Sequence, residues 1–411
     1  MIEIDANKNS SHLSVSEKLL NHKLFFITIV IIFCFEILVR DYLFDISIPI
    51  ILYLQKNFDY LFPIGRVFSF FCTFKGEMSV FLVCFNFSDI YKTFIFGTTG
   101  LLSTFLAGFL KLFYLSPRPF YYNTGIISIG CEGGYGNPSN HAIVSFCYYL
   151  SFYYIFIKKN KNIKYKKLCL SLIIIFILCI CFSRFYMGVH SLNQIFFGMY
   201  LGFSLYYFIF YVLEIEPKNS DEILEIIYKL NKYVFILLLI ITIGLIPYFI
   251  FKLDKRLAFQ YNIYISQFCP NIPNIKRLEN AALLNITTFS ITIIALLAIN
   301  FEYLFIFDEN INKFLKFNFF NEDNDLEKNL LNKNDNKKWN NTNLNKSILR
   351  LILIFIIVYI MNYIPKYISY QNNFYVVLFF KILFPLYIIT FFLFTYIKQL
   401  TGLCKLNNEN E

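Results

Sequence analysis

Two histidines lie where long apolar runs give way to short polar segments. One is His141, in the segment CEGGYGNPSNHA (residues 131–142), and the other is His190, in SRFYMGVHSLNQ (residues 183–194). The other two of the chain's four histidines are in the polar N-terminal tail. An imidazole can attack an electrophilic atom or transfer a proton near neutral pH. The pair therefore indicates chemistry in which one ring attacks and the other protonates a leaving oxygen.

Three basic side chains accompany the two histidines. Lys111 and Arg118 lie in KLFYLSPRP (residues 111–119), and Arg184 precedes His190 within its own segment. Each cation alone is also explained by a basic side chain that reaches from an apolar helix to the membrane interface. Three cations that converge would repel one another unless an anion lay between them. Together with the histidines they favour a dianionic phosphate as the ligand.

The segments around the histidines carry further polar groups. Ser139 or Asn137 can cap a helix that begins near His141, and a helix N-terminus offers unpaired N–H groups to an anion. Gln194 lies four residues after His190, so on a helix the two side chains share a face. Its oxygen can accept the proton of one ring nitrogen, which leaves a lone pair on the other nitrogen. Each feature taken alone also fits an ordinary glycine-rich loop with an interfacial histidine.

The elements that must position these residues are membrane-spanning helices. Of the 411 residues, 57% are hydrophobic and 16% are charged, which excludes an ordinary soluble domain and predicts an all-α polytopic membrane helix bundle. The segment 46–56 is too short to cross and is expected to lie along the interface. The stretch 308–346 is rich in Asn and Lys and predicts a loop. About ten spans are predicted, at 24–40, 77–91, 93–115, 141–157, 168–183, 190–213, 233–251, 281–307, 348–365 and 374–397.

The charge pattern predicts the orientation of these spans. The loop KKNKNIKYKK (residues 158–167) contains six lysines and no acid, so it is expected on the cytoplasmic side. The span ends that carry the candidate residues then fall on the lumenal or outer face. Basic residues between 252 and 277 argue for the opposite orientation, but the short lysine loop is the purer signal. The net charge of +10 is spread over loops and, without a nucleic-acid motif, predicts no nucleic-acid partner.

The three segments together resemble a known family. The spacings K-x6-R-P, P-S-x-H and S-R-x5-H-x3-Q are similar to those of the type-2 phosphatidic acid phosphatase superfamily, over about residues 60–210. The resemblance implies that His190 is the nucleophile, forming a phosphohistidine, and that His141 is the general acid. It implies no metal and no other cofactor. The residues it implies for phosphoryl binding are Lys111, Arg118, Ser139 and Arg184.

Two positions depart from the usual family pattern. Asn140 stands where the family usually has Gly, and a larger side chain there can narrow the site. Gln194 stands where most members have Asp, and members similar to glucose-6-phosphatase carry Gln. A neutral amide still orients His190 but stabilises its cationic form less than a carboxylate does. Both changes leave open a reduced activity.

These observations define an expected organisation and function. We expect a polar cytoplasmic tail at 1–23, a six-helix phosphatase core at 24–213 and further spans at 214–411. We expect a phosphatase of the endoplasmic reticulum, with a lumenal site, that hydrolyses a phosphate monoester of a membrane lipid, such as a sphingoid-base phosphate or phosphatidic acid. A sugar phosphatase similar to glucose-6-phosphatase and an anion transporter remain alternatives, and no protein partner is indicated. Glu132 is either a contact to substrate hydroxyls or to Lys111, or a solvated loop acid.

Overall fold

The structure is a computed structural model that describes residues 22–87, 90–128 and 132–213, together with 261 and 263. Within these residues the regular structure is entirely helical, which confirms the expected all-α class. Three segments are π-helical turns, labelled η2, η3 and η4, and η1 is a short 3₁₀ helix. The elements in order are α2 (Lys23–Asn57), η1 (Asp59–Leu61), α3 (Phe62–Phe70), α4 (Phe74–Phe87), α5 (Ile90–Tyr114), α6 (Pro119–Tyr122), α7 (Asn140–Val144), η2 (Ser145–Tyr149), α8 (Leu150–Phe152), η3 (Tyr153–Lys158), α9 (Lys166–Tyr186), α10 (Leu192–Tyr207) and η4 (Phe208–Val212).

Three helical segments in the described part are long and apolar enough to cross a membrane. They are Ile95–Tyr122, which runs from α5 into α6, Lys166–Tyr186 and Leu192–Val212. They overlap the expected spans at 93–115, 168–183 and 190–213. The expected spans at 24–40 and 141–157 are also helical, within α2 and from α7 to η3. The four expected spans after residue 213 lie outside the described residues. The total of ten spans and the six-helix core therefore stay predictions.

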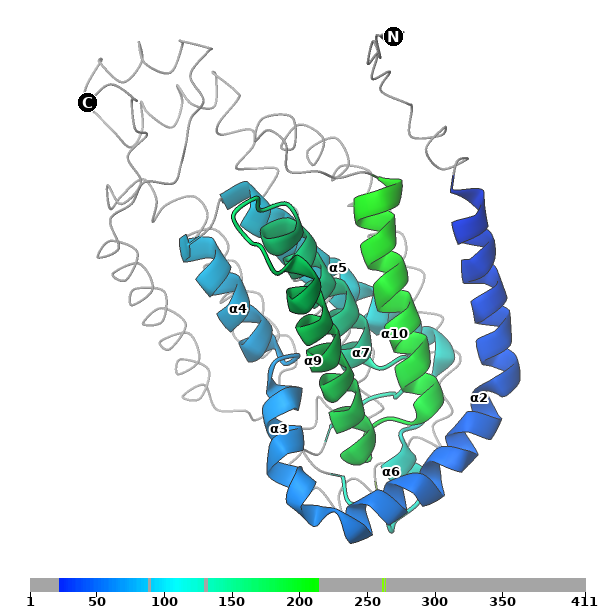
Figure 1. Cartoon of the computed structure of the whole chain (residues 1–411). Helices are drawn as coiled ribbons and strands as arrows, with labels where there is room; N and C mark the ends of the chain where they lie inside the picture. Colours follow the sequence, from blue (N-terminus) through cyan, green and yellow to red (C-terminus); the bar gives the residue numbers. More distant parts are fainter. Residues whose placement is uncertain (1–21, 88–89, 129–131, 214–260, 262, 264–411) are drawn as a thin grey trace, which may run out of the picture.

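The segment 46–56 belongs to α2, which continues through Pro49 to Asn57, and its expected place along the interface stays a prediction. Proline has no N–H to donate and its ring crowds the preceding turn, so it bends a helix that other contacts hold together. Figure 1 shows the second half of α2 running across the end of the bundle near α6. One such contact is the Ser47 hydroxyl, which accepts a hydrogen bond from the Leu192 N–H at 2.9 Å. The bend therefore joins α2 to the start of α10.

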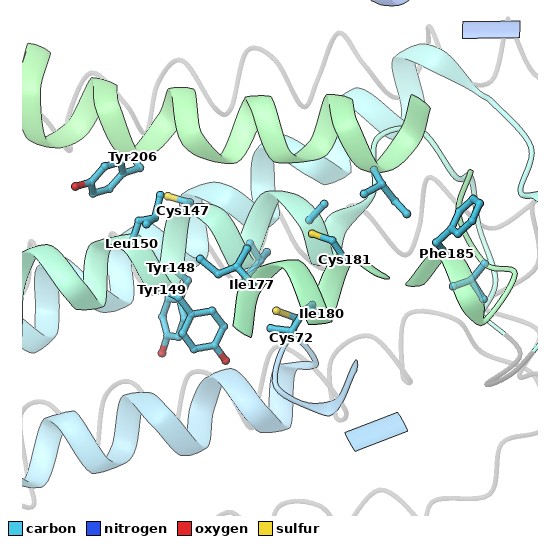
Figure 2. Packing of buried hydrophobic residues seen from close by; sticks show 14 of the residues in the cluster. Cys72, Cys147, Tyr148, Tyr149, Leu150, Ile177, Ile180, Cys181, Phe185 and Tyr206 are labelled. Carbon is cyan, nitrogen blue, oxygen red and sulfur yellow. The ribbon is translucent and has the colours of Figure 1, made fainter. Parts of the chain in front are cut away.

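The core of the bundle is built on close approach between α7 and α10. A Cβ added at Gly198 would lie 2.8 Å from the Ser139 carbonyl oxygen, and one at Gly202 only 2.3 Å from that of Ile143. Small residues let two helix backbones approach, and dispersion contacts then stabilise the pair. The two glycines therefore let α7 pack closely against the middle of α10. Figure 2 shows the packing of buried hydrophobic side chains in the core. The labelled ones are Cys72, Cys147, Tyr148, Tyr149, Leu150, Ile177, Ile180, Cys181, Phe185 and Tyr206.

The segments with the candidate chemistry meet at one end of this bundle. They are the end of α5, the short helix α6, the start of α7, the end of α9 and the start of α10 (Figure 1). The lysine loop between η3 and α9 lies at the opposite end. The expectation that the candidate segments share one face while the lysines occupy the other agrees with this arrangement.

Candidate active site

His190 is held in one tautomer by its two neighbours. The Gln194 side-chain N–H donates to the Pro117 carbonyl at 2.7 Å, so the amide oxygen of Gln194 faces His190 Nδ1 at 3.2 Å. On the other side of the ring, Arg118 Nη1 lies 3.1 Å from His190 Nε2. A guanidinium only donates, so Nε2 must be the acceptor and Nδ1 must carry the proton. The ring is thus fixed with the Nε2 lone pair directed toward the basic residues.

The position of Gln194 itself depends on the loop before α7. A Cβ at Gly136 would lie 2.5 Å from the Gln194 amide oxygen, so only glycine leaves room for this amide. The Gly136 N–H donates to the Ser116 carbonyl at 2.8 Å, and the Ser139 N–H donates to the Gln194 carbonyl at 2.9 Å. The Gln194 side-chain oxygen also accepts the Ser191 N–H at 3.4 Å, at the start of α10. These bonds align the two loops that carry the histidines.

Arg118 is buried and joins the same two loops. Its Nε and Nη2 donate to the carbonyls of Gly134 and Gly133, both at 3.0 Å, and Nη1 donates to Val189 at 3.0 Å. Gly134 has φ +75°, a backbone conformation that residues other than glycine rarely adopt. Most N–H groups of Arg118 are therefore committed to backbone carbonyls. The Arg118 side chain also donates a hydrogen bond to His190 Nε2.

Arg184 is fully buried and lies between a serine and an acid. Its Nη1 donates to the Ser69 hydroxyl at 2.5 Å, and its Nη2 forms an ion pair with Glu132 Oε1. The other carboxylate oxygen of Glu132 lies 3.5 Å from Arg118 Nη1. Burial opposes the charged form of Glu132, but Arg184, His141 and Arg118 hold the pKa of this carboxyl well below its usual value. Glu132 is therefore an ionised member of the cation cluster, and its interpretation as a solvated loop acid is wrong.

Three polar atoms near the start of α7 have no hydrogen-bond partner in the part of the chain that the structure describes. They are Ser139 Oγ, Asn140 Oδ1 and His141 Nε2, and all three are buried. Ser139 is at the N-cap position of α7, but its side chain makes no capping bond, contrary to the sequence expectation. The side chain of Asn137, the other expected cap, donates instead to Glu36 Oε1 at 2.7 Å. The Ser139 hydroxyl and His141 Nε2 are thus free to contact a ligand.

Electrostatics places Lys111 and both imidazoles in the same cluster. The charges of Arg118, Glu132 and Arg184 all act on the Lys111 ammonium, and Glu132 acts on both histidines. Burial, followed by Arg118, Lys111 and Arg184, lowers the pKa of His190 well below its usual value. His190 is therefore neutral at physiological pH, as an attacking nitrogen has to be. The cluster unites three cations, two imidazoles and one carboxylate.

Comparison with known proteins identifies the family. Residues 92–217 match the model of the PAP2 superfamily. These residues are a PAP2 superfamily domain. The dolichyldiphosphatase of Saccharomyces cerevisiae is 31% identical to the chain over 105 residues, which are 24% of this chain and 44% of the relative. The chain therefore spans less than half of the length of this curated relative, and no solved structure matches it.

The family match confirms the resemblance on which the candidate residues were chosen. All the candidate residues lie inside the PAP2 domain, and the structure brings them to one end of the bundle. They are Lys111, Arg118, Ser139, His141, Arg184, His190 and Gln194. Their individual roles stay predictions.

Sequence reasoning missed several residues that support the PAP2 site. Ser69 holds Arg184, and Glu36 holds Asn137. Gln55 donates to two backbone carbonyls, at 2.9 and 3.0 Å, and so ties the bent half of α2 to the loops beside the site. Glu36 is an acid in a long apolar stretch of α2, which is the signal that could have identified it, whereas Ser69 and Gln55 lie close to Arg66 and Lys56 and give no such signal.

Proposed function

We propose that the chain is an integral membrane phosphatase that hydrolyses a phosphate monoester of a membrane lipid through a phosphohistidine. The observation that carries the proposal is the arrangement of Gln194, His190 and Arg118, which leaves a neutral Nε2 lone pair beside a cluster of cations. The PAP2 domain and the phosphatase relative support the same class of reaction. Binding alone, as in a transporter, requires no such fixed imidazole, so the transporter alternative is less favoured.

In the first step, Arg118 transfers its hydrogen bond from His190 Nε2 to a phosphoryl oxygen, which frees the Nε2 lone pair. Nε2 then attacks the phosphorus atom, and the bond from phosphorus to the ester oxygen breaks. Protonated His141 gives its proton to the leaving oxygen, which departs as an alcohol. The phosphorylated imidazole keeps its proton on Nδ1, which donates its hydrogen bond to the Gln194 amide oxygen.

In the second step, water attacks the phosphohistidine. His141 takes a proton from this water, and the bond between phosphorus and His190 Nε2 breaks to release inorganic phosphate. Lys111, Arg184 and the Ser139 hydroxyl stabilise the charge on the phosphoryl oxygens in both transition states. The cycle ends with His190 neutral and the proton on His141, whose charge the phosphoryl dianion stabilises against the burial and the cations around it.

A lipid substrate suits the position of the site at the end of the bundle. Phe113, Tyr122 and Ile127 are exposed apolar side chains on segments that lead to the site. Acyl chains can stay in the bilayer beside such residues while the phosphate enters. Sphingoid-base phosphates and phosphatidic acid are the proposed substrates, and the proposed location is the endoplasmic reticulum with the site lumenal. Glucose 6-phosphate remains a second candidate, because CEGGYGNPSNH (residues 131–141) and Gln194 are similar to glucose-6-phosphatase.

The relative named dolichyldiphosphatase raises a third class of substrate, a lipid diphosphate. Phosphate release by the purified full chain should therefore be measured with sphingosine 1-phosphate, phosphatidic acid, farnesyl diphosphate and glucose 6-phosphate. We expect release in the presence of a chelator, inhibition by vanadate, and a preference for a lipid monoester. The matched control is His190→Ala, which should be inactive. Strict dependence on magnesium, or unchanged activity of that variant, would refute the proposal.

A further inference from the structure

We propose that Glu132 is a specificity-determining residue that favours a phosphate monoester over a diphosphate. This inference rests on the proposed function and names the residue that sets its substrate class. Glu132 forms an ion pair with Arg184 Nη2 and lies 3.5 Å from Arg118 Nη1. It is the acid in direct contact with these two arginines within the described residues.

The acid changes the formal charge of the site. Among the residues that the structure describes, Glu132 is the one carboxylate beside the basic side chains Lys111, Arg118 and Arg184, and it lowers the positive charge that this cluster presents to a ligand by one. The phosphoryl group of a monoester carries close to two negative charges at neutral pH. A diphosphate brings additional negative charge, which the Glu132 carboxylate repels.

The position of Glu132 increases the difference between a monoester and a diphosphate in their repulsion by the site. The side chain of Glu132 is 28% exposed, whereas those of Arg118 and Arg184 are 3% and 1% exposed. His190 is fully buried, so a substrate attacked there extends toward the more exposed side of the cluster. In a diphosphate the leaving group is a second phosphate, which then approaches the Glu132 carboxylate. In a monoester the leaving group at this place is an uncharged alcohol.

A purely structural role for Glu132 makes a different prediction. If the acid only held Arg184 in place, its removal would weaken the binding of every phosphate compound to a similar extent. If it sets the charge, its removal must change the ratio between phosphate and diphosphate binding, because the repulsion increases with the charge of the ligand. The ratio therefore separates the two roles.

The experiment measures the affinity of the purified full chain for inorganic phosphate and for pyrophosphate by calorimetry. The variant is Glu132→Gln, which keeps the shape and removes the charge. We expect the ratio of pyrophosphate affinity to phosphate affinity to rise about tenfold, as removing one nearby like charge does. The matched control is Asp41→Asn, which removes one exposed carboxylate and should leave the ratio unchanged. A change of less than twofold in Glu132→Gln would overturn the inference.

Two further measurements keep the inference testable. If Glu132→Gln does not fold, the wild-type chain decides, because it should bind phosphate at least as tightly as pyrophosphate. A tenfold wild-type preference for pyrophosphate would overturn the inference. Turnover of farnesyl phosphate and farnesyl diphosphate tests the proposed function separately. A chain that binds phosphate and pyrophosphate but releases phosphate from neither farnesyl compound refutes the proposed function. The ratio of the two affinities then still decides on Glu132.

Discussion

Replacing Gly136 with alanine puts a methyl group where the Gln194 amide lies. The new Cβ would be 2.5 Å from the amide oxygen, 2.6 Å from the amide nitrogen and 2.8 Å from the carbon that joins them. The backbone conformation is not the obstacle, since the described glycines with positive φ are Gly134 and Gly188. The amide must move, and with it the atom that accepts the His190 proton. We therefore expect slower phosphate release.

The moving amide breaks three hydrogen bonds, of which the bond from the Ser191 N–H is long, at 3.4 Å. The size of the effect follows from the two shorter ones. These are the bonds to the Pro117 carbonyl and to His190 Nδ1. Hydrogen bonds of this kind contribute about 1 kcal/mol each, so the combined loss is about 2 kcal/mol. Such a loss in the transition state corresponds to about a 30-fold lower kcat.

A double-mutant cycle shows whether Gly136 acts through Gln194. In Gln194→Ala the space for the new methyl group is available, so adding Gly136→Ala should change kcat by less than twofold. Gly65→Ala is the matched control, because its Cβ would make only ordinary contacts, the shortest being 3.7 Å to Tyr186. A full 30-fold loss in the Gln194→Ala background, or wild-type kcat for Gly136→Ala alone, would refute the reasoning.

The remaining predictions concern the second histidine, the pH profile and the orientation in the membrane. His141→Ala should lower kcat by about 100-fold or more while vanadate affinity changes little, and an equal loss in both would contradict its role as acid. Attack requires neutral His190, whose lowered pKa extends the neutral form to more acidic pH. After correction for ionisation of the substrate, kcat/KM should therefore fall on the acid side only below a pH of about 6.5. A fall in kcat/KM at or above that pH would contradict a neutral His190. The sequons at Asn340 and Asn345 should carry no glycan in a glycosylation-competent cell, since their loop is predicted to be cytoplasmic, and occupied sites would invert the orientation.

The parts of the site that sequence reasoning predicted are those set by local spacing. His190 and Gln194 are four residues apart. Gln194 lies in the first turn of α10 and His190 directly precedes that helix, so the spacing alone predicts their contact. The helical class also followed from composition and from the lengths of the apolar runs. These features need no knowledge of which distant segments meet.

The parts that were missed depend on contacts between distant segments. Ser69 and Arg184 are separated by 115 positions, and neither sequence neighbourhood indicates the other. The space that Gly136 leaves for Gln194 exists only because two loops meet. The course of α2 was not predicted either, because Pro49 disfavours a helix locally, whereas contacts such as that of Ser47 with α10 hold the helix together.

Trapping the phosphorylated enzyme tests the central claim most directly. The full chain should be mixed with its lipid phosphate substrate, denatured within milliseconds and digested for mass spectrometry. The account predicts one phosphoryl group on the nitrogen of His190, lost in His190→Ala and accumulating in His141→Ala when the leaving group is a good one. Turnover without any phosphorylated peptide, or a phosphoryl group on another residue, would contradict it.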